Sequence, residues 1–230
     1  MCKGSKSCVL LGSDPGTWSK AAPLLPPEWF DAQAVRFGQA VRHAADGDTA
    51  GAVAMLRTLR SDEMRAWFDE HGQVSGRRRR SVLRQPTPST GPSSLDPLRS
   101  PRRFEVAVYQ RDFHQCRYCG LKIIPKEVLY AFEKIVGTLE FRTRGTNAEQ
   151  HGVIHAFKAV VDHVEPYKRG GRTDFNNLVT ACPGCNYGKE AFTLEELGLD
   201  NPRDRVPVES DWDGLTSLLP ALSARANVTQ

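Results

Sequence analysis

Two cysteine pairs constrain the fold of this chain more than any other feature of its sequence. Each pair, Cys116-Arg-Tyr-Cys119 and Cys182-Pro-Gly-Cys185, has two residues between its cysteines, so both sulfurs can reach one ion from a tight turn. A redox site would need only one such pair, and the remaining alternative is two unrelated sets of free thiols. We therefore expect all four cysteines to bind a structural Zn²⁺, with a long insert looping out between the pairs.

The other two cysteines, Cys2 and Cys8, lie in the leading tail without obvious partners. No secretory signal is recognised there, so a disulfide framework is not expected. The chain also lacks an apolar run of the length that a membrane span needs. These observations predict a cytoplasmic protein that does not interact with membranes.

The segment between and after the cysteine pairs contains side chains suited to phosphodiester hydrolysis. That reaction needs an activated water, a cation on the phosphate oxygens and stabilisation of the leaving alkoxide. A neutral histidine is a suitable base near pH 7, and a carboxylate with an amide oxygen suits Mg²⁺ or Mn²⁺. Asp162, His163 and Asn186 could supply these parts. Taken alone, the Asp-His dipeptide could also be a surface ion pair.

The same segment predicts a strand, a loop, a returning strand and a helix. Valines suggest the first strand, and Pro166 would end it. Ideal alternation would point Asp162 and His163 to opposite faces, so a common site needs a twist or bulge at the strand end. The four expected elements span residues 157–164, 169–172, 178–180 and 186–190.

Three sequence motifs resemble those of the HNH endonuclease family. They are Arg-Asp-x-x-x-Cys-x-x-Cys-Gly at 111–120, Asp-His-Val-x-Pro at 162–166, and Gly-Gly-x-Thr-Asp-x-x-Asn-Leu-Val-Thr-x-Cys-x-x-Cys-Asn-x-x-Lys at 170–189. The resemblance covers about residues 104 to 195, which is less than half of the chain. The resemblance implies a ββα-metal fold with a four-cysteine zinc ribbon.

The resemblance also implies a role for each residue that matches the family pattern. His163 matches the general base and Asp162 the first metal ligand. Asn177 matches the middle residue that braces the loop and orients the base, with Asn176 as the alternative for this position. Asn186 takes the final position, where many members have histidine, as a metal ligand. The implied activity is a DNA endonuclease with one catalytic Mg²⁺ or Mn²⁺.

The fold class expected for the whole chain is α+β. The nuclease domain would be preceded by a small all-α module of three amphipathic helices. Either a protein partner or a purely structural role would suit this module. The expected divisions are a disordered tail at 1–26, the helical module at 27–75, a basic Pro/Ser-rich linker at 76–103, the nuclease domain at 104–197 and a C-terminal extension at 198–230.

Basic residues point to nucleic acid as the partner. The net charge is +4, and the positive charge is clustered. The linker run could attract phosphates or could be a solvated tether. Candidate contacts in the nuclease domain flank the predicted site. The candidates are Arg77, Arg78, Arg79 and Arg80 in the linker, and Lys168, Arg169, Arg172 and Lys189 in the domain.

Further elements follow from apolar spacing. Residues 104–112 and 125–136 are expected to form helices, and 141–150 a loop. In the first of these helices, Val106, Val108 and Tyr109 would pack inward. A last helix is predicted over 211–219, ended by Pro220. His151 and His155 are expected to be ordinary surface or strand histidines.

Two other functions remain open at this point. One is a zinc-ribbon module that binds nucleic acid without catalysis, although such a module would not need Asp162, His163 and the asparagines together. The other is an RNA-cleaving nuclease toxin, because nothing in the sequence separates RNA from DNA.

Overall fold

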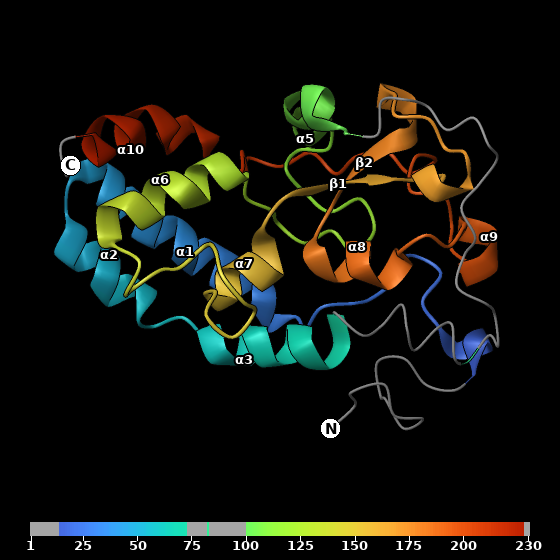
Figure 1. Cartoon of the computed structure of the whole chain (residues 1–230), viewed down its shortest axis with the longest axis horizontal. Helices are drawn as coiled ribbons and strands as arrows, with labels where there is room; N and C mark the ends of the chain where they lie inside the picture. Colours follow the sequence, from blue (N-terminus) through green and yellow to red (C-terminus); the bar gives the residue numbers. More distant parts are fainter. Residues whose placement is uncertain (1–13, 73–81, 83–99, 228–230) are drawn as a thin grey trace.

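The computed structural model describes residues 14–72, 82 and 100–227 of the 230-residue chain. Cys2, Cys8 and the run Arg77–Arg80 lie outside the described residues. The fold is α+β, with a small antiparallel sheet among helices, as predicted. Helices α1, α2, α6 and α10 gather at one end, while β1, β2, α8 and α9 form the other (Figure 1).

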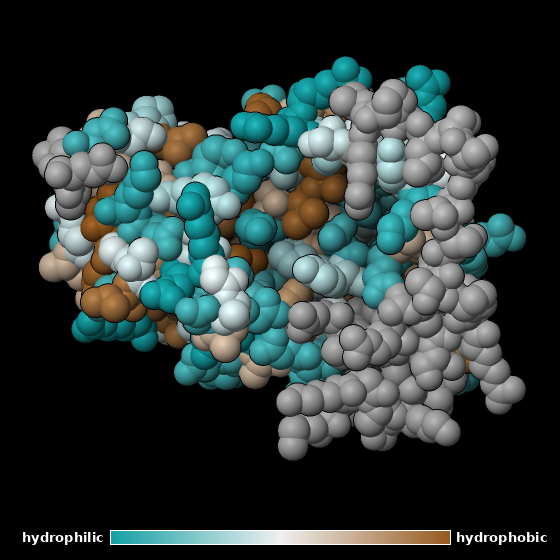
Figure 2. Space-filling view, viewed as in Figure 1, coloured by the Kyte–Doolittle hydropathy of each residue, from teal (hydrophilic) through white to brown (hydrophobic). Residues whose placement is uncertain are grey.

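The helices and strands follow one another along the chain in this order: α1 (Trp29–Asp46), α2 (Thr49–Leu56), α3 (Ser61–Trp67), α5 (Glu105–Arg111), α6 (Lys126–Val136), α7 (Gly152–Phe157), β1 (Val160–His163), β2 (Leu178–Ala181), α8 (Pro183–Lys189), α9 (Leu194–Leu197) and α10 (Leu219–Ala226). None of the described helices combines the length and the apolar character needed to cross a membrane. On the face shown in Figure 2, hydrophilic residues cover most of the described surface, with smaller apolar groups among them.

The three N-terminal helices form where the apolar spacing predicts them. Gly47, with φ of 90°, ends α1 in the left-handed conformation that glycine adopts without strain. Asp48 then caps α2 by accepting a 2.8 Å hydrogen bond from the Gly51 amide. Ser61 is the first residue of α3, and its hydroxyl accepts a 2.9 Å hydrogen bond from the Gly152 amide. That bond ties α3 to α7.

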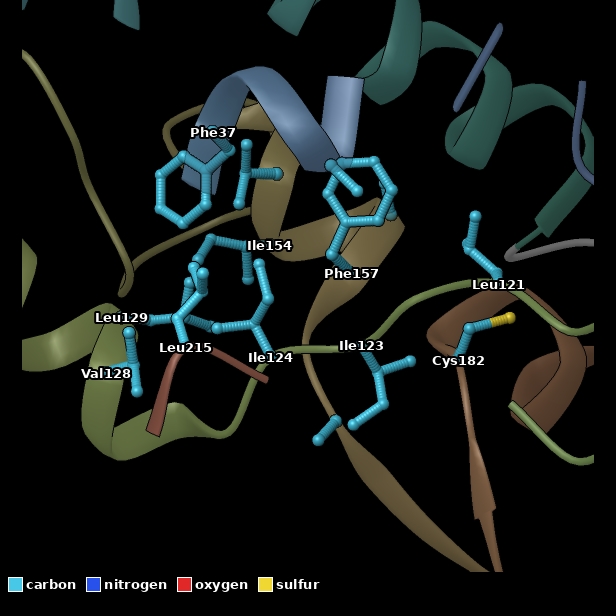
Figure 3. Close-up of a cluster of buried hydrophobic side chains, with 14 of the residues drawn as sticks. Phe37, Leu121, Ile123, Ile124, Val128, Leu129, Ile154, Phe157, Cys182 and Leu215 are labelled. Atoms are coloured by element: carbon cyan, nitrogen blue, oxygen red, sulfur yellow. The ribbon is translucent and has the colours of Figure 1, made fainter. Parts of the chain in front are cut away.

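The helical segment at 27–75, expected as a module of its own, shares one hydrophobic core with later parts of the chain. Phe30 on α1 lies edge-on to Phe157 on α7, with 5.9 Å between ring centroids. Phe37, which is also on α1, packs against Phe132 on α6 with 5.2 Å between the ring centroids. Figure 3 shows this cluster, with Leu215 from the C-terminal region reaching the same core. The described part of the segment therefore packs against the later part of the chain as one structural unit.

The sheet that carries the predicted catalytic residues is short. β1 pairs with β2 so that Asp162 lies opposite Val179 and His163 opposite Leu178. The prediction that the strand begins at residue 157 is wrong, because α7 runs to Phe157. All residues of α7 are buried, including His155 at 4% exposure, so His155 is not a surface or strand residue.

The C-terminal helix also differs from the prediction. Gly214 and Leu215 have φ of 67° and 64°, which breaks any helix over 211–219. α10 begins at Leu219, and Pro220 lies in its first turn, where a missing amide hydrogen costs nothing. On α5, Val108 and Tyr109 are buried as expected, whereas Val106 is 68% exposed.

His151 makes the stability of this fold sensitive to acid. Its ring lies 4.9 Å from that of Phe141, and burial, with the nearby charge of Arg65 second, lowers its pKa to about 4. In the unfolded chain the same histidine binds a proton near pH 6.5. The contribution of neutral His151 to the unfolding free energy is therefore complete above that pH and is lost as the pH falls towards 4. His151→Asn keeps an acceptor for the Val153 amide but cannot be protonated. We expect the wild type to lose about 2 kcal/mol more unfolding free energy than His151→Asn between pH 7 and 4.5.

Denaturant unfolding of both proteins at several pH values measures this difference. Parallel pH dependences of the two proteins would contradict the expectation, since the other buried histidines are present in both.

Candidate functional site

The four cysteines of the two pairs converge as predicted. Their sulfur atoms all lie within 4.8 Å of one another. Cys119 Sγ and Cys182 Sγ are 3.7 Å apart, and a tetrahedral zinc with bonds of about 2.3 Å requires sulfur–sulfur edges of about 3.8 Å. The donor set and its spacing therefore fit a structural zinc ion.

Local backbone geometry builds this cluster from both pairs. Gly120, with φ of 78°, closes the turn after the first pair. Cys182 is the N-cap of α8, and its sulfur accepts from the Cys185 amide at 3.4 Å. A side chain at Gly184 would meet the Trp67 ring at 3.2 Å, so the second turn also fits closely against α3. The cysteine cluster is thus part of the packed core.

The thiols of the cluster differ in acidity. Burial raises the pKa of Cys185, and hydrogen bonding to the other three thiols adds to the effect. At Cys116 burial acts in the same direction, but hydrogen bonds from Cys119, Cys182 and Cys185 outweigh it and lower the pKa well below its usual range. These hydrogen bonds favour the thiolate form of Cys116, which is the form of cysteine that binds a metal ion.

Asp162 and His163 line the same pocket, of about 500 Å³, at the end of β1. Ideal alternation would have separated these two side chains. Asp162 Oδ2 accepts a 2.7 Å hydrogen bond from the Tyr118 hydroxyl and lies 3.3 Å from Lys189 Nζ. Burial, with the Asp162 charge second, raises the pKa of Tyr118 well above its usual range, so this phenol stays a donor.

Lys189 occupies a position that a surface phosphate contact could not have. Its side chain is 0% exposed, and its ammonium donates to the His163 carbonyl at 2.7 Å besides pairing with Asp162. The reason is that α8 turns this position towards β1. A buried ammonium beside a buried carboxylate compensates the charge of both groups, and each would be costly alone.

Of the other three candidate phosphate contacts in this region, two are exposed and one forms an ion pair within the fold. Lys168 is exposed and lines the pocket of Asp162 and His163, and Arg172 is exposed. Arg169 instead pairs with Glu196 at 2.6 Å and fastens α9 to the loop.

Thr173 orients the ring of His163. His163 Nε2 lies 2.9 Å from Thr173 Oγ1, and this hydroxyl can donate or accept. Tyr167 lies beside the ring at 5.9 Å between centroids. His163 is half-buried, so its ring is both held in place and open to the pocket.

Asn177 holds together the two ends of the loop after β1. Its Oδ1 accepts from the Glu165 amide at 2.8 Å, and its Nδ2 donates to the carbonyls of Glu165 at 3.0 Å and Arg172 at 2.8 Å. Asn176 is exposed. The loop is tight, since a side chain at Gly171 would come within 1.9 Å of the Glu165 carbonyl. Of the two asparagines, Asn177 has the contacts of a bracing residue.

Substituting each asparagine separately distinguishes the two. Asn177→Ala should lower the unfolding free energy by about 2–3 kcal/mol, because the side chain loses three hydrogen bonds to the backbone of Glu165 and Arg172. Asn176→Ala is the matched control and should stay within about 0.5 kcal/mol of the wild type. Denaturant titrations of zinc-loaded proteins test this, and equal effects of the two substitutions would contradict it.

The structure does not place Asn186 in the pocket of Asp162 and His163. Asn186 lines a neighbouring pocket of about 450 Å³. Val161 and Tyr187 border both pockets, so the two spaces adjoin across these side chains. Tyr187 is 46% exposed and stands between them.

Sequence reasoning missed three residues that hold the site together, Tyr118, Thr173 and Asp112. The Asp112 carboxylate is buried, accepts from the Thr180 amide at 2.8 Å and binds the Arg111 guanidinium through both oxygens at 2.9 Å. It thereby links α5 to β2. The Arg-Asp dipeptide before the first cysteine pair was the signal that could have identified it.

The segment that holds the predicted catalytic residues is similar to one known protein family. Residues 150–192 match the family model of the HNH endonuclease, a segment that contains α7, β1, β2 and α8. No curated protein and no solved structure matches the chain. The match confirms the resemblance to the HNH endonuclease family, and it lies in the part of the chain that holds Asp162, His163 and the second cysteine pair. The first cysteine pair lies outside the matched segment and joins it through the cluster.

Proposed function

We propose that this chain is a metal-dependent HNH endonuclease that hydrolyses phosphodiester bonds in DNA. The observation that carries the proposal is the common pocket of Asp162 and His163, within the segment that matches the HNH family model. A carboxylate and an imidazole in one pocket provide a cation ligand and a base for a bound phosphodiester.

One Mg²⁺ or Mn²⁺ is the cation that fits this pocket best. The two contacts of Asp162 named above both involve Oδ2, so Oδ1 is the oxygen that a cation would bind. The amide oxygen of Asn186 is the second proposed ligand, from the adjoining pocket. Water and phosphate oxygens would complete the coordination, as is common for Mg²⁺. When bound, the cation would polarise the phosphate and stabilise the leaving oxygen.

His163 is the proposed general base. It would take a proton from a water molecule whose oxygen attacks phosphorus in line, while the bond from phosphorus to the leaving 3′ oxygen breaks. Thr173 would keep the ring directed for this transfer, and Asn177 would brace the loop that carries Thr173. Lys189, pointing inward, would balance the charge of Asp162 and would not contact the substrate.

Zinc in the cysteine cluster is proposed to have a structural role. Cys182 and Cys185 open α8, and β2 runs directly into Cys182. The first pair brings Tyr118 to Asp162. A closed four-sulfur site offers no open position for a substrate, so catalysis would take place in the pocket beside it.

Basic side chains near the pocket are the proposed phosphate contacts. Lys168 and Arg172 are exposed there. Arg77–Arg80 lie outside the described residues and keep their proposed role of attracting phosphates through charge alone. Such contacts do not separate DNA from RNA, and an RNA-cleaving nuclease is the second candidate for that reason.

Incubation with two substrates tests the proposed function. Zinc-loaded protein should convert supercoiled plasmid to nicked or linear forms with Mg²⁺ or Mn²⁺ and should not do so with EDTA. Cleavage of RNA with intact plasmid would favour the second candidate. Binding of nucleic acid without cleavage of either substrate would contradict catalysis and favour a non-catalytic zinc-ribbon module.

A further inference from the structure

We infer that Tyr118 is a positioning residue that holds the cation ligand Asp162 in place from within the zinc-binding turn. The inference rests on the proposed function, because it assigns to Tyr118 a part in cation binding. It links two sites that the sequence presents as separate, the cysteine cluster and the catalytic pocket.

Tyr118 lies between the two cysteines of the first pair and points away from the solvent. Its side chain is 2% exposed, and its hydroxyl donates a 2.7 Å hydrogen bond to Asp162 Oδ2. Bonds of this kind to a charged acceptor are stronger than those between neutral groups.

The backbone around Tyr118 is fastened to the sheet that carries Asp162. The Arg117 amide donates to the Thr180 carbonyl at 2.8 Å, and Thr180 pairs with Val161, the residue before Asp162. Arg205 donates to the carbonyl of Arg117 at 2.8 Å. Donor and acceptor therefore belong to one rigid unit, and zinc at Cys116 and Cys119 would fix the turn that carries the donor.

Lys189 approaches the same carboxylate oxygen from α8. Its ammonium lies 3.3 Å from Asp162 Oδ2 and is anchored on the His163 carbonyl. Tyr118 and Lys189 together restrict rotation of the carboxylate, so Oδ1 keeps one direction. Partners that orient a metal ligand in this way typically contribute about 10-fold to 100-fold to metal affinity or activity.

The test measures cation binding directly, without nucleic acid. Full-length, zinc-loaded Tyr118→Phe, Asp162→Ala and wild type are titrated with Mn²⁺ by calorimetry or by electron paramagnetic resonance. Tyr118→Phe should bind Mn²⁺ about 10-fold to 100-fold more weakly than the wild type. It should keep one equivalent of zinc by elemental analysis, because the cysteines are unchanged. Tyr130→Phe on α6 removes a phenol hydroxyl away from both sites and should bind like the wild type.

Each departure from this result overturns a specific step. Wild-type Mn²⁺ affinity in Tyr118→Phe would overturn the positioning role while leaving the proposed function standing. Loss of zinc from Tyr118→Phe would mean that the residue supports the cysteine cluster and not Asp162. If Asp162→Ala binds Mn²⁺ as well as the wild type, the proposed cation site itself fails, and the inference fails with it.

Discussion

Replacing Cys185 with serine is expected to abolish cooperative folding of this protein at room temperature. The thiol of Cys185 is fully buried and lies next to the Leu24 carbonyl of the N-terminal segment. Cys185 itself lies in the first turn of helix α8. Structural zinc contributes an apparent binding free energy of about 10–16 kcal/mol in small zinc domains. That is comparable to the whole stability of a typical domain, which is about 5–15 kcal/mol. Losing one of four ligands should therefore remove most of the stability of the fold.

Elemental analysis and thermal melts measure this effect together. Cys185→Ser should hold less than one equivalent of zinc and show no sharp unfolding transition, and EDTA should act on the wild type in the same direction. Cys2→Ser and Cys8→Ser are the matched controls, since the two Cys-x-x-Cys pairs already supply the four sulfurs of the cluster. A full zinc equivalent and a wild-type melting temperature in Cys185→Ser would exclude a structural role for the cluster.

The features that the sequence predicted well depend on local signals. Paired cysteines with two residues between them suit a tight turn that directs both sulfurs to one ion, so the number and spacing of the cysteines predicted the four-sulfur cluster. The apolar face of α6, with Val128, Phe132 and Ile135 buried, follows from helical periodicity in the same way. The short strands β1 and β2 were recognisable from their valines and from the motif that surrounds them.

The features that were missed depend on contacts between distant parts of the chain. Tyr118 and Asp162 are 44 residues apart, and the lysine at the end of the motif looked like a surface residue until α8 was seen packed on β1. The strand was predicted to begin at Phe157, which is the last residue of α7, because a short apolar run does not distinguish helix from strand, and packing of this segment on α1 and α3 decides between them. Pro220 was read as a stop, although a proline tolerates the first turn of a helix equally well.

His163→Ala is expected to lower the rate of DNA cleavage by a factor of about 10²–10⁴, because a positioned base commonly contributes that much. The substitution removes the imidazole and its contact with Thr173, but it keeps the backbone carbonyl that accepts from Lys189. The buried pair of Lys189 and Asp162 should therefore survive, and zinc content and melting temperature should stay near those of the wild type. Single-turnover cleavage of plasmid at saturating protein and Mg²⁺ measures the chemical step.

A second histidine substitution separates loss of a base from loss of any histidine. His43 on α1 pairs with Asp48 at 2.9 Å, and its side chain is 44% exposed, so His43→Ala should cleave at the wild-type rate. Imidazole added to His163→Ala should restore part of the lost rate if the missing group is a proton acceptor, since the pocket beside Asp162 would then be open to it. Wild-type cleavage by zinc-loaded, folded His163→Ala would assign the base to another residue. Loss of Mn²⁺ binding in the same variant would instead place His163 among the cation ligands.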